Sequence, residues 1–210
     1  MISFSGYNSV IYDANCIIYY CFKTELLSRK GTLIVIDSPP FTDIIQNVTQ
    51  FLTNRKIRIR TILIVFNEIT TELLSLVIKQ RINDGHLRKD LGLARGEKFP
   101  EDIEYNLNKK LKQKVKKMRY ESWFELDEKY IPDHLLLTKI RTFFYERKND
   151  SEQKGIPSNN DMILILYSKD TVLPLISNDN HICKFKEDLE KDKFTHKIIP
   201  LMECAPENPN

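Results

Sequence analysis

The sequence has no apolar run that approaches the ~18–20 residues that a membrane-spanning helix requires. Its first residues, Met1 to Tyr7, lack a basic stretch followed by an apolar one, so we expect no signal peptide. The net charge of +3 is too small to indicate nucleic-acid binding unless the charges cluster. These absences predict a cytosolic (cytoplasmic) protein that makes no membrane contact.

Motifs for several common kinds of site are also missing. None of the four cysteines forms a C-x-x-C pair, which disfavours a zinc site and predicts free thiols. The histidines form no metal-binding pair either, which disfavours zinc and a histidine-based hydrolase. Neither a G-x-x-x-x-G-K-[ST] loop nor a G-x-S-x-G elbow occurs, so the sequence does not support an NTPase or a serine hydrolase. The residues concerned are Cys16, Cys21, Cys183, Cys204, His86, His134, His181 and His196.

What is present is sufficient apolar material for one substantial domain. The 210 residues are 41% hydrophobic and 29% charged, as in ordinary soluble globular proteins. We find no internal repeat and no low-complexity tract. The sequence therefore predicts a single domain over residues 1–210, with a segment of different character at 84–150.

A strand followed by an acid near the N-terminus organises the rest of the interpretation. Val10-Ile11-Tyr12 has the β-branched and aromatic composition of a buried strand, and Asp13 follows it. Ligands bind outside the carboxyl ends of strands in open α/β sheets. Asp13 or Asn15 could equally cap a following helix. From this stretch alone, a cap and a metal or catalytic role carry even weight.

Three further acids stand beside predicted elements. Within the stretch 57–83, Ile62–Phe66 resembles a strand by composition, but a helical period from Phe66 to Ile78 predicts a helix over at least the latter half of the stretch. We expect Glu68 near the start of that helix. A negative charge there is favourable, so a structural and a functional role for Glu68 weigh equally. Asp161 follows Ser158 at the spacing of a capping box and opens another helix. Asp179 follows a later predicted strand.

The final third of the chain reads as helix, strand, helix, strand, which predicts an α/β fold with a parallel sheet covered by helices. If the strands that end at Asp13 and Asp179 are neighbours, the two acids lie close together at one edge. Helices that begin at Glu68 and Asp161 can face the same edge. Four converging carboxylates repel one another, and Mg²⁺ or Mn²⁺ would offset that repulsion. The four acids are therefore candidate metal ligands and catalytic residues.

The order of these motifs resembles that of the PIN-domain nucleases. The matching stretches are Asp13-Ala14-Asn15 after a strand, Val65 to Ile69 around Glu68, Asn160-Asp161 at a helix start, and Ser177-Asn178-Asp179 after a strand. The resemblance covers roughly residues 9–80 and 157–201. Two features differ: Ala14 stands where the family has a hydroxyl residue, and residues 84–150 exceed what its compact toxins need.

The resemblance implies a three-layer α/β/α sandwich and a site that binds Mg²⁺ or Mn²⁺ and cleaves RNA. Asp13, Glu68, Asp161 and Asp179 would be its four acids. Ser177 would be the hydroxyl that orders them, and Asn15 would be the polar partner of Asp13. Many members are toxins of toxin–antitoxin pairs and others process RNA. The implied partners are therefore RNA, a protein antitoxin or regulator, and a second copy in a homodimer.

Residues 84–150 read as a helical, basic insertion. Pro100-Glu101-Asp102 is typical of a helix start, and Ile103, Leu107, Leu111, Val115 and Met118 form an apolar stripe on the helix that follows. The other face is basic. A solvated helix face is the more common explanation, and a track for the RNA backbone is the alternative. The candidate RNA-binding residues are Lys109, Lys112, Lys116, Lys117 and Arg119.

Two other functions compete with the nuclease. A haloacid-dehalogenase-type phosphatase would use Asp13 as its nucleophile, but that family has a second Asp two residues later, where Asn15 stands, and Glu68 would have no role. A catalytically inactive PIN-like module that binds RNA or protein is the other alternative. The presence of all four acids favours the enzyme.

Overall fold

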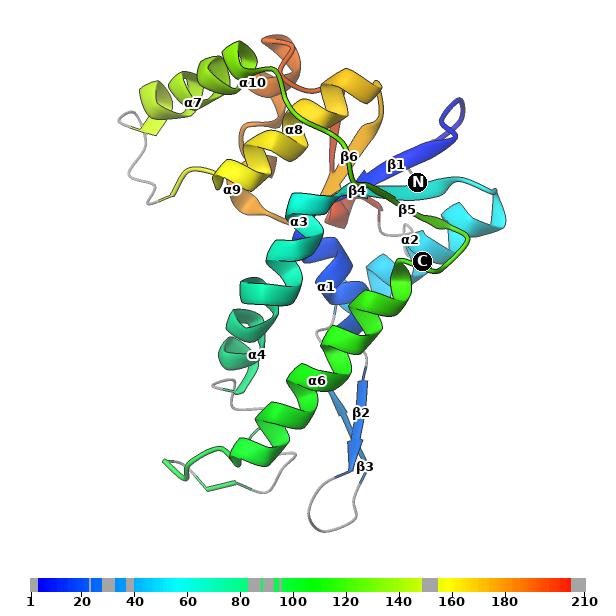
Figure 1. Cartoon of the computed structure of the whole chain (residues 1–210), viewed down its shortest axis with the longest axis vertical. Helices are drawn as coiled ribbons and strands as arrows, with labels where there is room; N and C mark the ends of the chain where they lie inside the picture. The colour runs from blue at the N-terminus through cyan, green and yellow to red at the C-terminus, as the bar shows by residue number, and fades with distance from the viewer. Residues whose placement is uncertain are drawn as a thin grey trace, which may run out of the picture.

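A five-stranded parallel sheet forms the centre of the protein, in the order β5-β4-β1-β6-β7 (Figure 1). This computed structural model describes residues 4–22, 24–27, 33–36, 40–82, 88, 93–94, 96–148 and 155–204. The strands are β1 (Ser9–Tyr12), β4 (Arg58–Ile62), β5 (Phe124–Asp127), β6 (Pro174–Ser177) and β7 (Lys197–Pro200). Every neighbouring pair is parallel. The predicted α/β class with a parallel sheet is therefore confirmed.

The two central strands explain why the sheet lies at the core. All four residues of β1 and all four of β6 are buried. Strands covered on both faces read as continuous apolar runs, which is the pattern of Val10-Ile11-Tyr12 and Leu175-Ile176. Their register pairs Ile11 with Leu175 and Tyr12 with Ile176. The residues that follow β1 and β6 consequently leave the sheet side by side.

Helices lie on both sides of the sheet (Figure 1). One group comprises α7, α8 and α10, and the other includes α1, α2 and α6, with α3 and α4 leading away from the sheet. Their bounds are α1 (Ala14–Phe22), α2 (Phe41–Asn54), α3 (Leu63–Glu68), α4 (Leu74–Ile82), α6 (Glu101–Met118), α7 (His134–Lys148), α8 (Asn159–Thr171), α9 (Asn180–Cys183) and α10 (Lys186–Lys191). A 3₁₀ turn, η2 (Leu201–Cys204), follows β7.

A smaller antiparallel ribbon, β2 (Thr24–Leu27) and β3 (Leu33–Ile36), is separate from the central sheet. In Figure 1 it extends beside the N-terminal half of α6. All four cysteines are free thiols, as the sequence predicts. No helix among the described residues is long and apolar enough to cross a membrane.

The position of Glu68 differs from the sequence prediction. Strand β4 ends at Ile62, and the helix already begins at Leu63, so Glu68 is the last residue of α3 rather than a first-turn residue. A π-helical turn, η1 (Ile69–Leu73), continues directly into α4. Val65, Phe66 and Ile69 are buried at helical spacing, and this packing outweighs the strand-like composition. The expectation that Glu68 serves as a helix-start charge is therefore wrong.

The segment predicted as a helical insertion is only partly helical. Helix α6 begins after Pro100 and buries Ile103, Leu107, Leu111, Val115 and Met118, as predicted. Strand β5, however, pairs with β4 along its whole length and belongs to the central sheet. Residues 83–87, 89–92, 95 and 149–150 of the surrounding segment lie outside the described residues.

Candidate metal centre

Asp13 occupies the carboxyl end of β1 and is almost completely buried, with 2% of its surface exposed. Its backbone N–H donates to the carbonyl of Ile176 on β6 at 3.2 Å, which joins the ends of the two strands. Its side chain accepts from the Cys16 backbone N–H at 2.6 Å, in the first turn of α1. Asp13 therefore caps α1, and its carboxylate also faces the end of β6. The metal or catalytic role of Asp13 stays a prediction.

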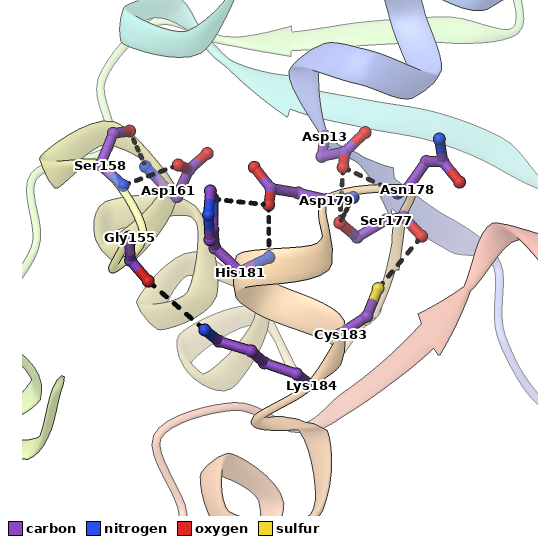
Figure 2. A network of polar contacts seen from close by, with 10 residues as sticks. All are labelled: Asp13, Gly155, Ser158, Asp161, Ser177, Asn178, Asp179, His181, Cys183 and Lys184. Carbon is purple, nitrogen blue, oxygen red and sulfur yellow. Dashed lines mark hydrogen bonds and ion pairs between the residues drawn. The ribbon is translucent and has the colours of Figure 1, made fainter. Parts of the chain in front are cut away.

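The loop after β6 turns its polar groups toward Asp13 (Figure 2). The Ser177 hydroxyl donates to Asp13 Oδ2 at 2.5 Å, and the Asn178 backbone N–H donates to the same oxygen at 3.0 Å. The Ser177 hydroxyl also accepts from the Asp179 backbone N–H at 3.0 Å. Ser177 thus links the first and the last of the predicted acids, because it bonds to both residues.

Asp161 and Asp179 each cap a helix. Ser158 and Asp161 form the predicted capping box of α8, with Ser158 N–H to Asp161 Oδ2 at 2.9 Å and Asp161 N–H to Ser158 Oγ at 3.1 Å. Asp179 Oδ1 accepts from the His181 backbone N–H at 2.6 Å at the start of α9. Only one oxygen of each carboxylate makes these bonds. Asp161 Oδ1 and Asp179 Oδ2 bond to no described residue, and Figure 2 shows them turned toward each other.

The pKa values indicate that three of the acids share one electrostatic environment. Burial raises the pKa of Asp161 to about 6, and the charges of Asp179 and Asp13 add to that increase. Burial also raises the pKa of Asp13, although the bonds from Ser177, Cys16 and Asn178 act in the opposite direction. Like charges close together raise carboxylate pKa values in this way. The structure therefore brings Asp13, Asp161 and Asp179 close enough for the charges of Asp13 and Asp179 to act on Asp161. Their joint role as a site stays a prediction.

Glu68 reaches this group through a neighbour of Asp161. The Asn160 side-chain amide donates to Glu68 Oε2 at 2.8 Å, which ties the end of α3 to the first turn of α8. Glu68 has one bonded oxygen and is partly buried. It therefore lies at the margin of the three-acid group, where it contacts Asn160, the residue before Asp161.

The chemistry of this site fits a hard divalent cation, since its donors are carboxylate oxygens whose mutual repulsion raises a pKa. As the side chains stand, no three His, Cys, Asp or Glu residues in the described ranges are arranged to hold a metal ion. Internal bonds occupy at least one oxygen of each acid. The four-ligand metal site therefore stays a prediction. The type of donor atoms and the proximity of three of the acids support it.

Two residues that the sequence interpretation did not assign to this site, His181 and Gly155, also belong to it. The His181 ring lies beside Asp179, with Nδ1 3.3 Å from Oδ1. Its position two residues after Asp179 was the available signal. Gly155 has a φ of +121° and packs so closely on the His181 ring that an added Cβ would lie 2.4 Å from Nε2. A glycine is required there for both reasons. The Asn15 side chain, by contrast, makes no hydrogen bond to a described residue, so its role beside Asp13 stays a prediction.

The candidate RNA-binding residues of α6 do not share one surface. Lys109, Lys112 and Lys116 line a groove of about 780 Å³ that also includes Ser75 of α4. Lys117 instead lines a separate pocket between α1, α2 and α6. Arg119 forms an ion pair with Glu128. The predicted basic face is thus divided, and three of its five residues remain together.

The comparisons with known proteins return no match: no family model fits the chain, and no curated protein or solved structure is similar to it.

Proposed function

We propose that this protein is a metal-dependent endoribonuclease that hydrolyses RNA phosphodiester bonds. One observation carries the proposal: Asp13, Asp161 and Asp179, far apart in sequence, converge at the carboxyl edge of β1 and β6, where the charges of Asp179 and Asp13 add to the burial that raises the pKa of Asp161. The strand order reverses at this point, because β4 and β6 lie on opposite sides of β1. Such switch points are where open α/β sheets bind ligands.

Asp13, Asp161, Asp179 and Glu68 are the residues that would hold Mg²⁺ or Mn²⁺, directly or through water. The ion would supply charge neutralisation at the scissile phosphate and a more acidic water. Oxygen donors without histidine or cysteine suit these two ions. The free oxygens of Asp161 and Asp179 are available for this role. The site requires no protein nucleophile.

The remaining residues of the site hold the acids in position. The Ser177 hydroxyl and the backbone N–H groups of Asn178 and Cys16 fix the orientation of Asp13 and partly offset the increase in its pKa that burial causes. His181 restrains Asp179, and Asn160 restrains Glu68. Partners of this kind orient ligands before an ion or a substrate arrives, and their loss commonly reduces activity about 10–100-fold.

The groove lined by Lys109, Lys112 and Lys116 supports RNA as the substrate. It lies between α4 and α6, and α4 continues the helix that carries Glu68. Lysines in a groove attract phosphates without reading sequence. An antitoxin, a regulator or a second copy of the chain are further partners that the family resemblance suggests. The bond that holds Glu68 beside Asn160 supports the nuclease over the phosphatase, in which Glu68 would have no role.

The test is cleavage of an end-labelled single-stranded RNA with Mn²⁺, with Mg²⁺ and with EDTA. We expect cleavage with either ion and none with EDTA. Asp13→Asn, Asp179→Asn and Glu68→Gln should reduce cleavage to background. The matched control is Glu72→Gln, an exposed acid on the adjoining π-helical turn, which should leave cleavage unchanged.

Two results would contradict the proposal. Intact RNA with every divalent ion, together with undiminished RNA binding, would indicate an inactive binding module. Release of phosphate from a small phosphomonoester, with a phosphoryl group trapped on Asp13, would indicate the phosphatase instead.

A further inference from the structure

A second polar site lies on the α1–α2 side of the sheet, away from the four acids. It is a pocket of about 550 Å³ bounded by α1, α2, the C-terminal end of α6 and Trp123. Pockets of this volume accommodate small-molecule ligands. No residue of the candidate metal centre lines it. The pocket therefore needs its own explanation.

Two aromatic rings form one wall of this pocket. Trp123 and Tyr20 meet edge to face, with ring centroids 5.3 Å apart, and both side chains are partly exposed. The Trp123 carbonyl accepts from the Ile59 N–H of β4 at 2.8 Å, which fixes the backbone beside the central sheet. A partly exposed, rigidly anchored indole provides a surface on which a planar ring can stack.

The rest of the lining is rich in groups that recognise the edge of a base. Gln46 and Gln50 come from α2, and Glu121 follows α6. The hydroxyls of Thr49 and Thr53, which also line the pocket, donate to backbone carbonyls of α2. The side-chain amides of Gln46 and Gln50 bond to no described residue. Glutamine amides pair with adenine in two-bond contacts, and carboxylates accept from exocyclic amino groups. The apolar part of the lining comes from Cys21 and Met118 beside the two aromatic rings.

Positive charge stands at the α6 side of the same pocket. Lys114 and Lys117 both line it, against a single acid, Glu121. The Lys117 amino group makes no ion pair with a described residue. An aromatic wall, amide donors and acceptors, and a cation together match the three parts of a nucleotide: its ring, its base edge and its phosphate.

We infer that this pocket binds a nucleotide, with the base stacked on Trp123, its edge bonded by Gln46 and Gln50, and its phosphate held by Lys117. The pocket is linked to the acid site through two elements. Tyr20 lies on α1 seven residues after Asp13, about 10 Å along the helix. Thr49 bonds through its hydroxyl to the hydroxyl of Tyr12, the residue before Asp13, at 3.0 Å.

If the proposed function holds, the bound nucleotide is one residue of the RNA chain whose phosphodiester lies near Asp13. The pocket then selects which base stands a fixed distance from the cleaved bond. A free nucleotide presents the same chemistry. The two sources differ in one respect: only a chain extends from the pocket toward the acids and gains affinity from the additional contacts.

Trp123 is the only tryptophan of the chain, so its fluorescence reports on this pocket alone. The experiment titrates the full-length protein in EDTA with AMP, CMP, GMP and UMP, and with an eight-nucleotide single-stranded RNA. Omitting divalent ions makes the result independent of whether the protein cleaves RNA. We expect saturable quenching by at least one mononucleotide, and tighter binding of the RNA.

Three variants keep the shape of the lining and remove its polar groups: Gln46→Leu, Gln50→Leu and Lys117→Met. Gln46→Leu and Gln50→Leu should each weaken the affinity measured by quenching about tenfold, because a lost two-bond contact to a base costs about that factor. Lys117→Met should also weaken it, because the phosphate loses its cation. The matched controls are Gln80→Leu on α4 and Lys139→Met on α7. They change exposed residues of the same types that line neither the pocket nor the lysine groove, and they should have no effect on quenching.

The outcomes divide clearly. No saturable quenching by any mononucleotide or by the RNA would overturn the inference, as would quenching that the three pocket variants leave unchanged. Quenching by mononucleotides and by RNA with equal affinity would assign the pocket to a free nucleotide. Quenching without RNA cleavage under any metal would preserve the pocket and refute the proposed nuclease.

Discussion

Asp161 shows, at the scale of a single residue, how a structural duty and a functional one combine. Its carboxylate completes the capping box of α8, which alone would explain an acid at this position. Its pKa of about 6 shows in addition that burial and two other acids oppose its ionisation. A cap by itself would lower that pKa, since hydrogen bonds to a carboxylate favour the charged form. The increase in the pKa of Asp161 therefore comes from its burial and from the two neighbouring acids and not from its capping role.

We predict that Asp161→Asn stabilises the protein at pH 7.5 in EDTA. The folded-state pKa of about 6 exceeds the ordinary 3.8, so the free energy of unfolding falls as pH rises between these values. Above pH 6 the folded wild type contains an ionised, buried Asp161, which lowers its free energy of unfolding. The neutral side chain of Asp161→Asn has no such cost. The amide oxygen can still accept from Ser158. Urea denaturation should show a gain of about 2 kcal/mol at pH 7.5 that vanishes near pH 4.

The control for that measurement is Asp170→Asn, an acid in the last turns of the same helix, whose effect should not reproduce this pH dependence. A destabilised Asp161→Asn variant at pH 7.5 would show that the cap outweighs the repulsion.

Ser177 has the opposite energetic role, because its hydroxyl satisfies a buried charge. Ser177→Ala removes one of three hydrogen bonds to Asp13 and one from the Asp179 N–H. We expect the free energy of unfolding to fall by about 1–3 kcal/mol, since a buried group is left under-bonded. Ser75→Ala, which removes a longer bond to Asn108 at 3.3 Å, should cost less. Equal losses in the two variants by thermal denaturation would contradict this role.

At the scale of elements, the sequence predicted those parts whose local signals agree with their packing. Helix α6 has a Pro-Glu-Asp start and a continuous apolar stripe, and α8 has its capping box, so both are found where expected. Strand β5 has neither a clear alternation nor a buried run, since only Phe124 of its four residues is fully buried. An edge strand derives its identity from pairing with β4, which the local sequence does not encode.

Glu68 was misplaced for a related reason. The residues from Ile62 to Phe66 have strand composition, and only tertiary packing decides that the chain turns helical at Leu63. No local sequence pattern predicts the π-helical turn that follows Glu68 either. Such turns occur frequently at functional sites. The identity of Glu68 as a site candidate came from motif order alone.

Helix α6 offers a prediction at this same scale. Lys112→Glu combined with Lys116→Glu reverses the charge of the groove, and we expect weaker RNA binding at every sequence. The slope of log affinity against log salt should fall by about 1–2 in magnitude, because roughly that number of phosphate contacts is lost. Filter binding at several salt concentrations measures both quantities. Lys139→Glu on α7 is the matched control. An equal effect of that variant would indicate that the α6 lysines form only a solvated helix face and do not bind RNA.

At the scale of the whole molecule, the sheet order determines the site. The sequence predicted that Asp13 and Asp179 would meet if their strands were neighbours, and β1 and β6 are neighbours. Order among parallel strands depends on long crossovers, so composition could not establish it. The sequence could not predict how the basic residues divide between two sides of α6 either. That division depends on where α1, α2 and α4 pack against the helix.

The same convergence predicts how the whole fold responds to metal. The acids come from β1, α3, α8 and the loop after β6, and they approach one another only in the folded chain. An ion that binds them therefore stabilises the native state, by about 2.7 kcal/mol at 100 times its Kd. We expect millimolar Mn²⁺ to raise the Tm by several degrees, since 1 kcal/mol corresponds to about 2–4 °C in a chain of this size. Asp13→Asn and Asp179→Asn should lose that rise, and Glu72→Gln should keep it. A rise that persists in both site variants would place the ion elsewhere on the protein.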